Sequence, residues 1–288
     1  MRGRVRLFLK LTKFPIAAVS TLSAAAGFVA GLHGWGWGLV PACLGTLLMA
    51  MGACALNEWQ ERDLDARMQR TRERPISSGA VSPGGALALG ASLVLAGGGL
   101  LWALCGPTPA GFGGLAVLWY NGVYTPLKRL TAFAVVPGAL IGALSPAIGW
   151  TAAGGSAGDL RLLALAFFFF IWQVPHFWLL LFKYGEEYAE AGVPSLTRLF
   201  STTQLGRLTF VWMLATAAAS LLLPLYGVSR AASTAYGFVA LDAVPVALAV
   251  VVLLRPGSSR ALRGAFVGIN LYACAVMALL AADAFWGT

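Results

Sequence analysis

The chain has 288 residues, of which 59% are apolar and only 11% are charged, and its formal net charge is +9. Soluble globular domains carry roughly a quarter charged residues, so this composition excludes an ordinary water-soluble domain. It also excludes a disordered chain, because too few polar residues are present to keep an unfolded chain solvated. The whole chain, residues 1–288, is therefore expected to form a single integral membrane domain.

Nine apolar stretches approach the ~20 residues that a helix needs to cross a hydrocarbon core about 30 Å thick. The segments between them are short, so no separate soluble domain can be divided from the rest. The sequence therefore predicts an all-α polytopic bundle of nine transmembrane helices. The predicted spans cover approximately residues 15–32, 36–56, 85–104, 109–123, 132–152, 160–182, 207–226, 235–254 and 264–286.

The basic residues fall almost entirely on one side of the predicted bundle. Of the 20 Lys and Arg residues, 18 lie in the N-terminal segment or in alternate connections, and only Arg161 and Arg230 lie on the other side. Positively charged segments stay in the cytoplasm, so this bias predicts a multi-pass protein of the cytoplasmic membrane with its N-terminus inside and its C-terminus outside. Membrane topology and contact with lipid headgroups explain the net charge better than nucleic-acid binding does.

The acidic residues are concentrated in two short stretches, 58–73 and 186–190, both directly after a span on the predicted cytoplasmic side. If the second span continues as a helix, Asn57, Glu61 and Asp65 fall four residues apart and share one helical face. Carboxylate and amide oxygens are suitable ligands for Mg²⁺, which fills its coordination sphere with water and substrate phosphate oxygens. The alternative is a helix end held only by salt bridges to nearby arginines.

Cations follow the acids closely along the chain. Arg70 and Arg74 come within ten residues of the first acidic stretch, and Lys128 and Arg129 follow the fourth span after Tyr124. Taken singly, these residues are typical of positive-inside loops and interfacial anchors. Combined with metal-ligating acids, they indicate a diphosphate site, because metal ions and guanidinium groups can bind oxygens on opposite sides of the same anion.

Two further features have both a functional and a structural interpretation. Glu186, Glu187 and Glu190 could hold a second metal ion on the same diphosphate, or could belong to an ordinary loop. His176 is the only histidine well inside a predicted span. A titratable group in a membrane is a functional candidate, although a single buried histidine is more often a packed, hydrogen-bonded residue.

These motifs, in this order, resemble those of the UbiA-type intramembrane prenyltransferases, and within them the protohaem IX farnesyltransferase (haem O synthase) branch. The resemblance covers roughly residues 10–200, and the last three spans match only in hydropathy. The matching motifs are Asn57-x3-Glu61-x3-Asp65, Met68-x-Arg70-Thr71-x2-Arg74-Pro75, Tyr124-Thr125-x2-Lys128-Arg129-x-Thr131, Gly142-Ala143-x2-Pro146-x2-Gly149-Trp150, Trp172-Gln173-x-Pro175-His176-Phe177-Trp178 and Glu187-Tyr188-x2-Ala191-Gly192-x-Pro194.

Two departures accompany the resemblance. Glu61, Glu186 and Glu187 stand where the family usually has Asp, which keeps the oxygen ligands on a longer arm. Lys13-Phe14-Pro15 replaces a Lys-Pro-Arg often found near the start, which removes one candidate cation.

The resemblance implies a bundle around a central cavity, with farnesyl diphosphate as donor, haem b as acceptor and Mg²⁺ as cofactor. The product would be haem O, whose new side chain arises from a haem vinyl group, the farnesyl C1 carbon and water. It implies metal ligands at Asn57, Glu61, Asp65, Glu186 and Glu187. It implies diphosphate-binding residues at Arg70, Arg74, Lys128 and Arg129, with Tyr124 facing the allylic cation and His176 as a candidate for acceptor binding.

Two alternatives remain open from the sequence. The nearer is a related prenyltransferase that acts on a quinone precursor or another lipophilic acceptor. The more distant is an ion-coupled transporter whose acidic residues bind the coupling ion. Transporter sites usually lie near the bilayer midplane, whereas these acids follow the ends of spans.

Overall fold

The computed structural model describes residues 2–286 and contains only helices within that range. Eight helices or helix pairs in this part of the chain are long and apolar enough to cross a membrane. At the remaining predicted span, 109–123, three short helices follow one another directly, namely α5 (Pro107–Val117), the π-helix η1 (Leu118–Tyr124) and α6 (Thr125–Leu127). The predicted all-α bundle is thereby confirmed.

The eight longer crossings are α2 (Phe14–Leu32), α3 (Leu39–Asp65), α4 (Pro83–Cys105), α7 with α8 (Val135–Gly138 and Leu140–Ala152), α9 (Leu160–Glu190), α11 (Thr202–Leu225), α12 with α13 (Ala232–Leu241 and Ala243–Leu254) and α14 (Ser259–Trp286). Two helices lie outside the crossings, namely α1 (Arg2–Leu11) before them and α10 (Leu196–Leu199) after α9.

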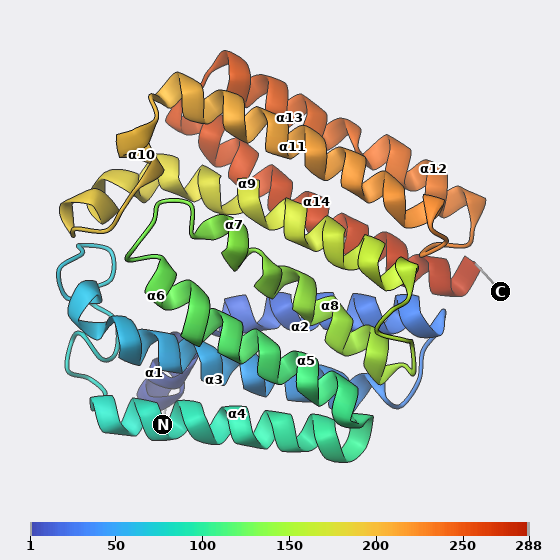
Figure 1. Cartoon of the computed structure of the whole chain (residues 1–288), viewed down its shortest axis with the longest axis horizontal. Helices are drawn as coiled ribbons and strands as arrows, with labels where there is room; N and C mark the ends of the chain where they lie inside the picture. The colour runs from blue at the N-terminus through green and yellow to red at the C-terminus, as the bar shows by residue number, and fades with distance from the viewer. Residues whose placement is uncertain (1, 287–288) are drawn as a thin grey trace.

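The helices pack side by side along one common direction (Figure 1). The closest pairs are α3 with α4, α2 with α8, and α11 with both α9 and α13. The connections that follow α3, α6 and α9 all lie at one end of the bundle, on the left in Figure 1. These connections carry seven of the 20 Lys and Arg residues, and this end is called the basic end below.

Two helices extend well beyond their predicted spans at the basic end. The predicted span 36–56 continues as α3 to Asp65, and the predicted span 160–182 continues as α9 to Glu190. A helix of 27 residues is about 40 Å long, longer than a hydrocarbon core of about 30 Å. The two acidic stretches therefore begin on the projecting last turns of helices, and Glu186, Glu187 and Glu190 are helical residues.

Glycines allow α2 and α8 to approach closely in the middle of the bundle. A Cβ atom added at Gly27 would collide with the backbone of Pro146, and one added at Gly149 would collide with the carbonyl of Ala24. Small residues at a membrane helix interface permit backbone contact that larger side chains prevent. This contact fixes α8 beside α2, and α8 forms one wall of the cavity described below.

Gly149→Ala should therefore destabilise the protein by about 1–3 kcal/mol, the usual cost of overpacking a well-packed core. Thermal unfolding in detergent is the measurement, and the variant should unfold at a clearly lower temperature. Gly99→Ala is the matched control on α4, because a Cβ atom there would meet no other atom within 4 Å. Equal unfolding temperatures for the two variants would contradict the close α2–α8 contact.

Candidate active site

Asn57, Glu61 and Asp65 share one face of α3, as their spacing predicts, and all three are buried. They line a cavity of about 500 Å³ near the basic end of the bundle. Burial of two carboxylates costs several kcal/mol each unless cations and hydrogen bonds compensate their charge. The neighbours of these three side chains are therefore central to the site.

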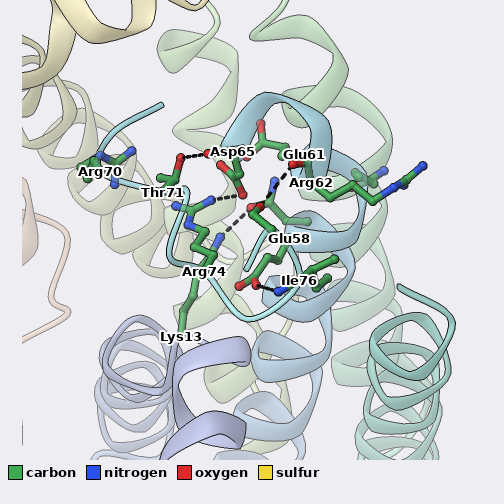
Figure 2. A network of polar contacts seen from close by, with 12 residues as sticks. Lys13, Glu58, Glu61, Arg62, Asp65, Arg70, Thr71, Arg74 and Ile76 are labelled. Atoms are coloured by element: carbon green, nitrogen blue, oxygen red, sulfur yellow. Dashed lines mark hydrogen bonds and ion pairs between the residues drawn. The ribbon is translucent and has the colours of Figure 1, made fainter. Parts of the chain in front are cut away.

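Each of the three polar side chains on α3 is held by a cation from a different segment of the chain, and the neighbourhood is shown in Figure 2. The contacts are Lys13 Nζ to Asn57 Oδ1 at 2.7 Å, Lys128 Nζ to Glu61 Oε1 at 2.5 Å, and Arg74 Nη1 to Asp65 Oδ2 at 2.6 Å. These cations precede α2, follow α6 and follow α3, so three separate connections converge on one helix face.

Burial and charge act differently on the three cations. Burial opposes the charged form of Arg74, but Asp65 raises the pKa of the Arg74 guanidinium above its ordinary value. Burial likewise opposes the charge on Lys128, yet Glu61 raises the pKa of the Lys128 ammonium. Burial, followed by repulsion from Arg74, lowers the pKa of Lys13. An anion entering beside Lys13 would therefore stabilise a charge that the protein alone supports weakly.

The end of α9 is tied to the connection that follows α3. Glu187 Oε1 accepts a hydrogen bond from the backbone N–H of Arg70 at 2.6 Å. The Arg70 guanidinium donates to the Tyr188 hydroxyl at 3.0 Å and lies 4.9 Å from the ring centre of Tyr184. Both predicted acidic stretches therefore lie at the same end of the bundle, with Arg70 between them.

The predicted metal ligands are thus only partly brought together. Asn57, Glu61 and Asp65 line the main cavity, whereas Glu186 and Glu187 line a neighbouring polar cavity. Among residues 2–286, no three His, Cys, Asp or Glu side chains are close enough together to hold one metal ion. In this arrangement the carboxylates of α3 are paired with cations, and their joint metal binding stays a prediction.

Two predicted site residues lie away from the lining of the main cavity. Arg129 is exposed and its guanidinium donates to the carbonyl of Gln60 at 2.8 Å. The His176 ring packs between Trp172 and Phe266, with ring centres 5.1 and 5.2 Å away. Their assignments to diphosphate and acceptor binding stay predictions.

The π-helix η1 brings two tyrosines to the cavity. Tyr120 and Tyr124 are stacked with ring centres 5.9 Å apart, and Tyr124 lies 6.4 Å from Phe177 on α9. The Lys128 ammonium lies 5.9 Å from the centre of the Tyr124 ring. π-helical turns are rare and are frequent at functional sites, because the wider turn changes where side chains point.

The cavity-lining residues that were not predicted as site residues include Lys13, Tyr120, Gln173 and Phe177. Lys13 has the left-handed backbone conformation, with φ of 47°, which is uncommon for a residue other than glycine. No pattern in the sequence predicts that backbone conformation. Gln173 could have been noticed, because an uncharged amide inside an apolar span is itself unusual.

The cavity has a charged part and an apolar part. The cations and acids lie at the basic end, whereas the deeper walls are mainly aliphatic and aromatic. This combination fits a molecule with an anionic head and a long apolar tail. The apolar lining includes Ile16, Met49, Ala50, Val117, Ile141, Ile148, Leu180 and Leu181.

The profile of the UbiA prenyltransferase family matches residues 16–282. The chain belongs to this family, whose members are intramembrane prenyltransferases. More particularly, its curated relatives include the protoheme IX farnesyltransferase of Geobacter sulfurreducens, which is 44% identical over 74% of this chain and 86% of that protein. The protoheme IX farnesyltransferase of Oleidesulfovibrio alaskensis is 36% identical over 77% of this chain and 78% of that protein.

Solved structures confirm the fold. A digeranylgeranylglyceryl phosphate synthase is similar with a TM-score of 0.76, at 12% identity over 99% of each chain. A UbiA homologue from Archaeoglobus fulgidus bound to GPP and Mg²⁺ is similar with a TM-score of 0.70, at 14% identity over 95% of this chain and 99% of that chain.

Lys128→Met should destabilise the protein by about 3–5 kcal/mol, because it leaves the buried Glu61 carboxylate without its cation. Adding Glu61→Gln to that variant should restore most of the loss, since the buried charge is then removed as well. Thermal unfolding in detergent measures both effects. Arg129→Met is the control on the neighbouring exposed residue and should cost less than about 1 kcal/mol. A double variant no more stable than Lys128→Met would refute the pairing.

Proposed function

We propose that this protein transfers the farnesyl group of farnesyl diphosphate to a vinyl group of haem b in a Mg²⁺-dependent reaction, giving haem O. The observation that carries the proposal is a cavity with clustered cations at one end and apolar walls beyond, in a chain that covers most of its protoheme IX farnesyltransferase relatives. This geometry matches an allylic diphosphate, which has a highly charged head and a hydrocarbon tail.

The diphosphate binds at the basic end of the cavity. Arg74, Lys128, Lys13 and Arg70 all line the cavity there and can donate hydrogen bonds to phosphate oxygens. Cleavage of the allylic C–O bond develops negative charge on the leaving group, and prearranged cations stabilise that charge in the transition state. Lys128 and Arg74 already face the site, so they can exchange a carboxylate for a phosphate partner with little movement.

The donor set suits Mg²⁺. Asn57, Glu61 and Asp65 offer one amide and two carboxylate groups on successive turns, and oxygen ligands of this kind are the ones Mg²⁺ prefers. Glu187 and Glu186 lie at the same end and would complete the set from α9. When bound, the metal would supply Lewis-acid stabilisation to the departing diphosphate.

The apolar part of the cavity protects the allylic cation from bulk water until the vinyl group attacks it. The Tyr124 and Phe177 rings lie beside one another next to Lys128, at the boundary between the charged and apolar parts. Their faces can stabilise positive charge at the farnesyl C1 carbon. His176 remains a candidate for acceptor binding and Arg129 for diphosphate binding, although neither residue lines the main cavity.

The two alternative functions predict different positions for the acidic residues or a different acceptor. An ion-coupled transporter would require the acids near the bilayer midplane, whereas they lie on the last turns of α3 and α9, and the family is one of prenyltransferases. A quinone precursor as acceptor would use the same diphosphate site and the same fold. Only the identity of the acceptor separates it from haem b.

The test is an acceptor comparison with the purified protein, labelled farnesyl diphosphate and Mg²⁺. Mass spectrometry should detect farnesylated, hydroxylated haem with haem b as acceptor, and no prenylated product with hydroxybenzoate. Chelation of the metal should abolish the reaction, and renewed Mg²⁺ should restore it. Prenylated hydroxybenzoate in place of haem O would overturn the assignment of the acceptor.

Within the same assay, Asp65→Asn should reduce prenyl transfer at least 100-fold, because both the metal and Arg74 lose their anionic partner. This loss corresponds to about 3 kcal/mol of transition-state stabilisation. Asp63→Asn is the matched control, since the Asp63 side chain is 75% exposed and pairs with Arg62 at 3.8 Å. Retention of full activity in Asp65→Asn would remove that residue from the metal site.

We also propose that the basic end faces the cytoplasm, with the N-terminus inside and the C-terminus outside the cytoplasmic membrane. The 18 basic residues that follow the positive-inside rule support this orientation. A reporter enzyme that is active only outside the cytoplasm should be active when fused after residue 288 and inactive when fused after residue 201. The reverse pattern would invert the topology.

A further inference from the structure

Gln173 is a polar side chain in the membrane part of α9 whose function is not explained by the diphosphate site. It lines the main cavity, and its Oε1 atom is buried and has no hydrogen-bond partner among the described residues. An unpaired buried amide oxygen costs about 1–3 kcal/mol. The Gln173 side-chain amide lines the cavity, so rotation of the amide would present its unpaired oxygen to a molecule that enters with the substrates.

The position of Gln173 relative to the reacting centre follows from two glycines of the adjoining wall. A Cβ atom at Gly138 would collide with the Tyr124 ring, and a Cβ atom at Gly142 would collide with Gln173 Oε1. Gly138 ends α7 and Gly142 lies near the start of α8, so the Tyr124 ring and the Gln173 amide oxygen pack against neighbouring parts of the same cavity wall. Gln173 also precedes Phe177, the aromatic neighbour of Tyr124, by one turn of α9.

We propose, on the basis of the function above, that Gln173 Oε1 positions the water molecule that becomes the hydroxyl group of the product. The farnesyl C1–O bond breaks, and its electron pair leaves with the diphosphate. The vinyl π electrons then form the bond between the terminal vinyl carbon and farnesyl C1, which leaves the positive charge on the vinyl carbon attached to the porphyrin ring.

Water completes the reaction at that second carbon. A lone pair of the water oxygen forms the new C–O bond, and the proton that is lost passes to the released diphosphate, so no oxidant or reductant is needed. The attacked carbon lies one C–C bond beyond the carbon joined to C1, and the water lies about 3 Å beyond it. The water acceptor Gln173 lines the same cavity as the Tyr124 and Phe177 rings, one turn of α9 before Phe177, and is therefore close to the carbon that the water attacks.

Gln173 acts by orienting the water and not by contact with the reacting carbons, so it is a positioning residue. Its removal should therefore change the identity of the product more than the rate of farnesyl transfer. Without the ordered water, the cation can lose a proton and form an alkene that is lighter than haem O by one water molecule. Gln173→Met removes the hydrogen-bonding amide at similar length. The ratio of hydroxylated to dehydrated farnesyl haem should fall about tenfold or more, the effect of losing one buried hydrogen bond.

The experiment uses the full-length protein with farnesyl diphosphate, haem b and Mg²⁺, and mass spectrometry of the extracted haems. Gln173→Glu keeps an oxygen at the same position and should retain the hydroxylated product. Thr216→Val is the control, since Thr216 is buried in α11, bonds only to its own helix and does not line the cavity. Its product ratio should equal that of the unmodified protein.

The outcomes separate this proposal from the proposed function. If the unmodified protein forms no farnesylated haem, the function itself is wrong. If it does, an unchanged product ratio in Gln173→Met overturns the role of Gln173, as does complete loss of farnesyl transfer in a variant that still unfolds at the normal temperature. If Gln173→Met does not fold, the ratio is read in Gln173→Asn, which withdraws the oxygen by one carbon and should also lower it.

Discussion

Charge compensation on one face of α3 is the constraint on which the rest of the structure depends. Glu61 and Asp65 are 3% and 2% exposed, and such burial is tolerated only with close cations. Those cations come from the start of α2, the connection after α3 and the end of α6. The same contacts therefore position three connections and assemble the candidate active site, so the fold and this site depend on each other at this end of the bundle.

The same arrangement offers the proposed diphosphate a set of cations that already face the cavity. In the proposed mechanism, the cations exchange carboxylate oxygens for phosphate oxygens, while the carboxylates and Asn57 are released to the metal. In the same proposal, the apolar lining beyond Tyr124 isolates the reactive cation from bulk water, and Gln173 positions the one water that becomes part of the product.

Much of the site was predictable because its residues repeat with the period of a helix. Asn57, Glu61 and Asp65 fall on one face whenever the second span continues, and the structure shows that it does. The contribution of Lys13 was not predictable, because it depends on a left-handed residue between two helices. Tyr120 was also missed, since a π-helical turn alters the spacing of side chains that an α-helical pattern assumes.

The sequence by itself determined the membrane class, the number of crossings and the positions of the acids and cations, because hydropathy and helical period are local properties. It could not determine which cation pairs with which acid, nor that Glu187 binds the backbone of Arg70 across 117 residues. It also could not place His176 against α14 instead of the cavity. These outcomes depend on how helices rotate and pack against each other, and that rotation is settled only by contacts between distant segments.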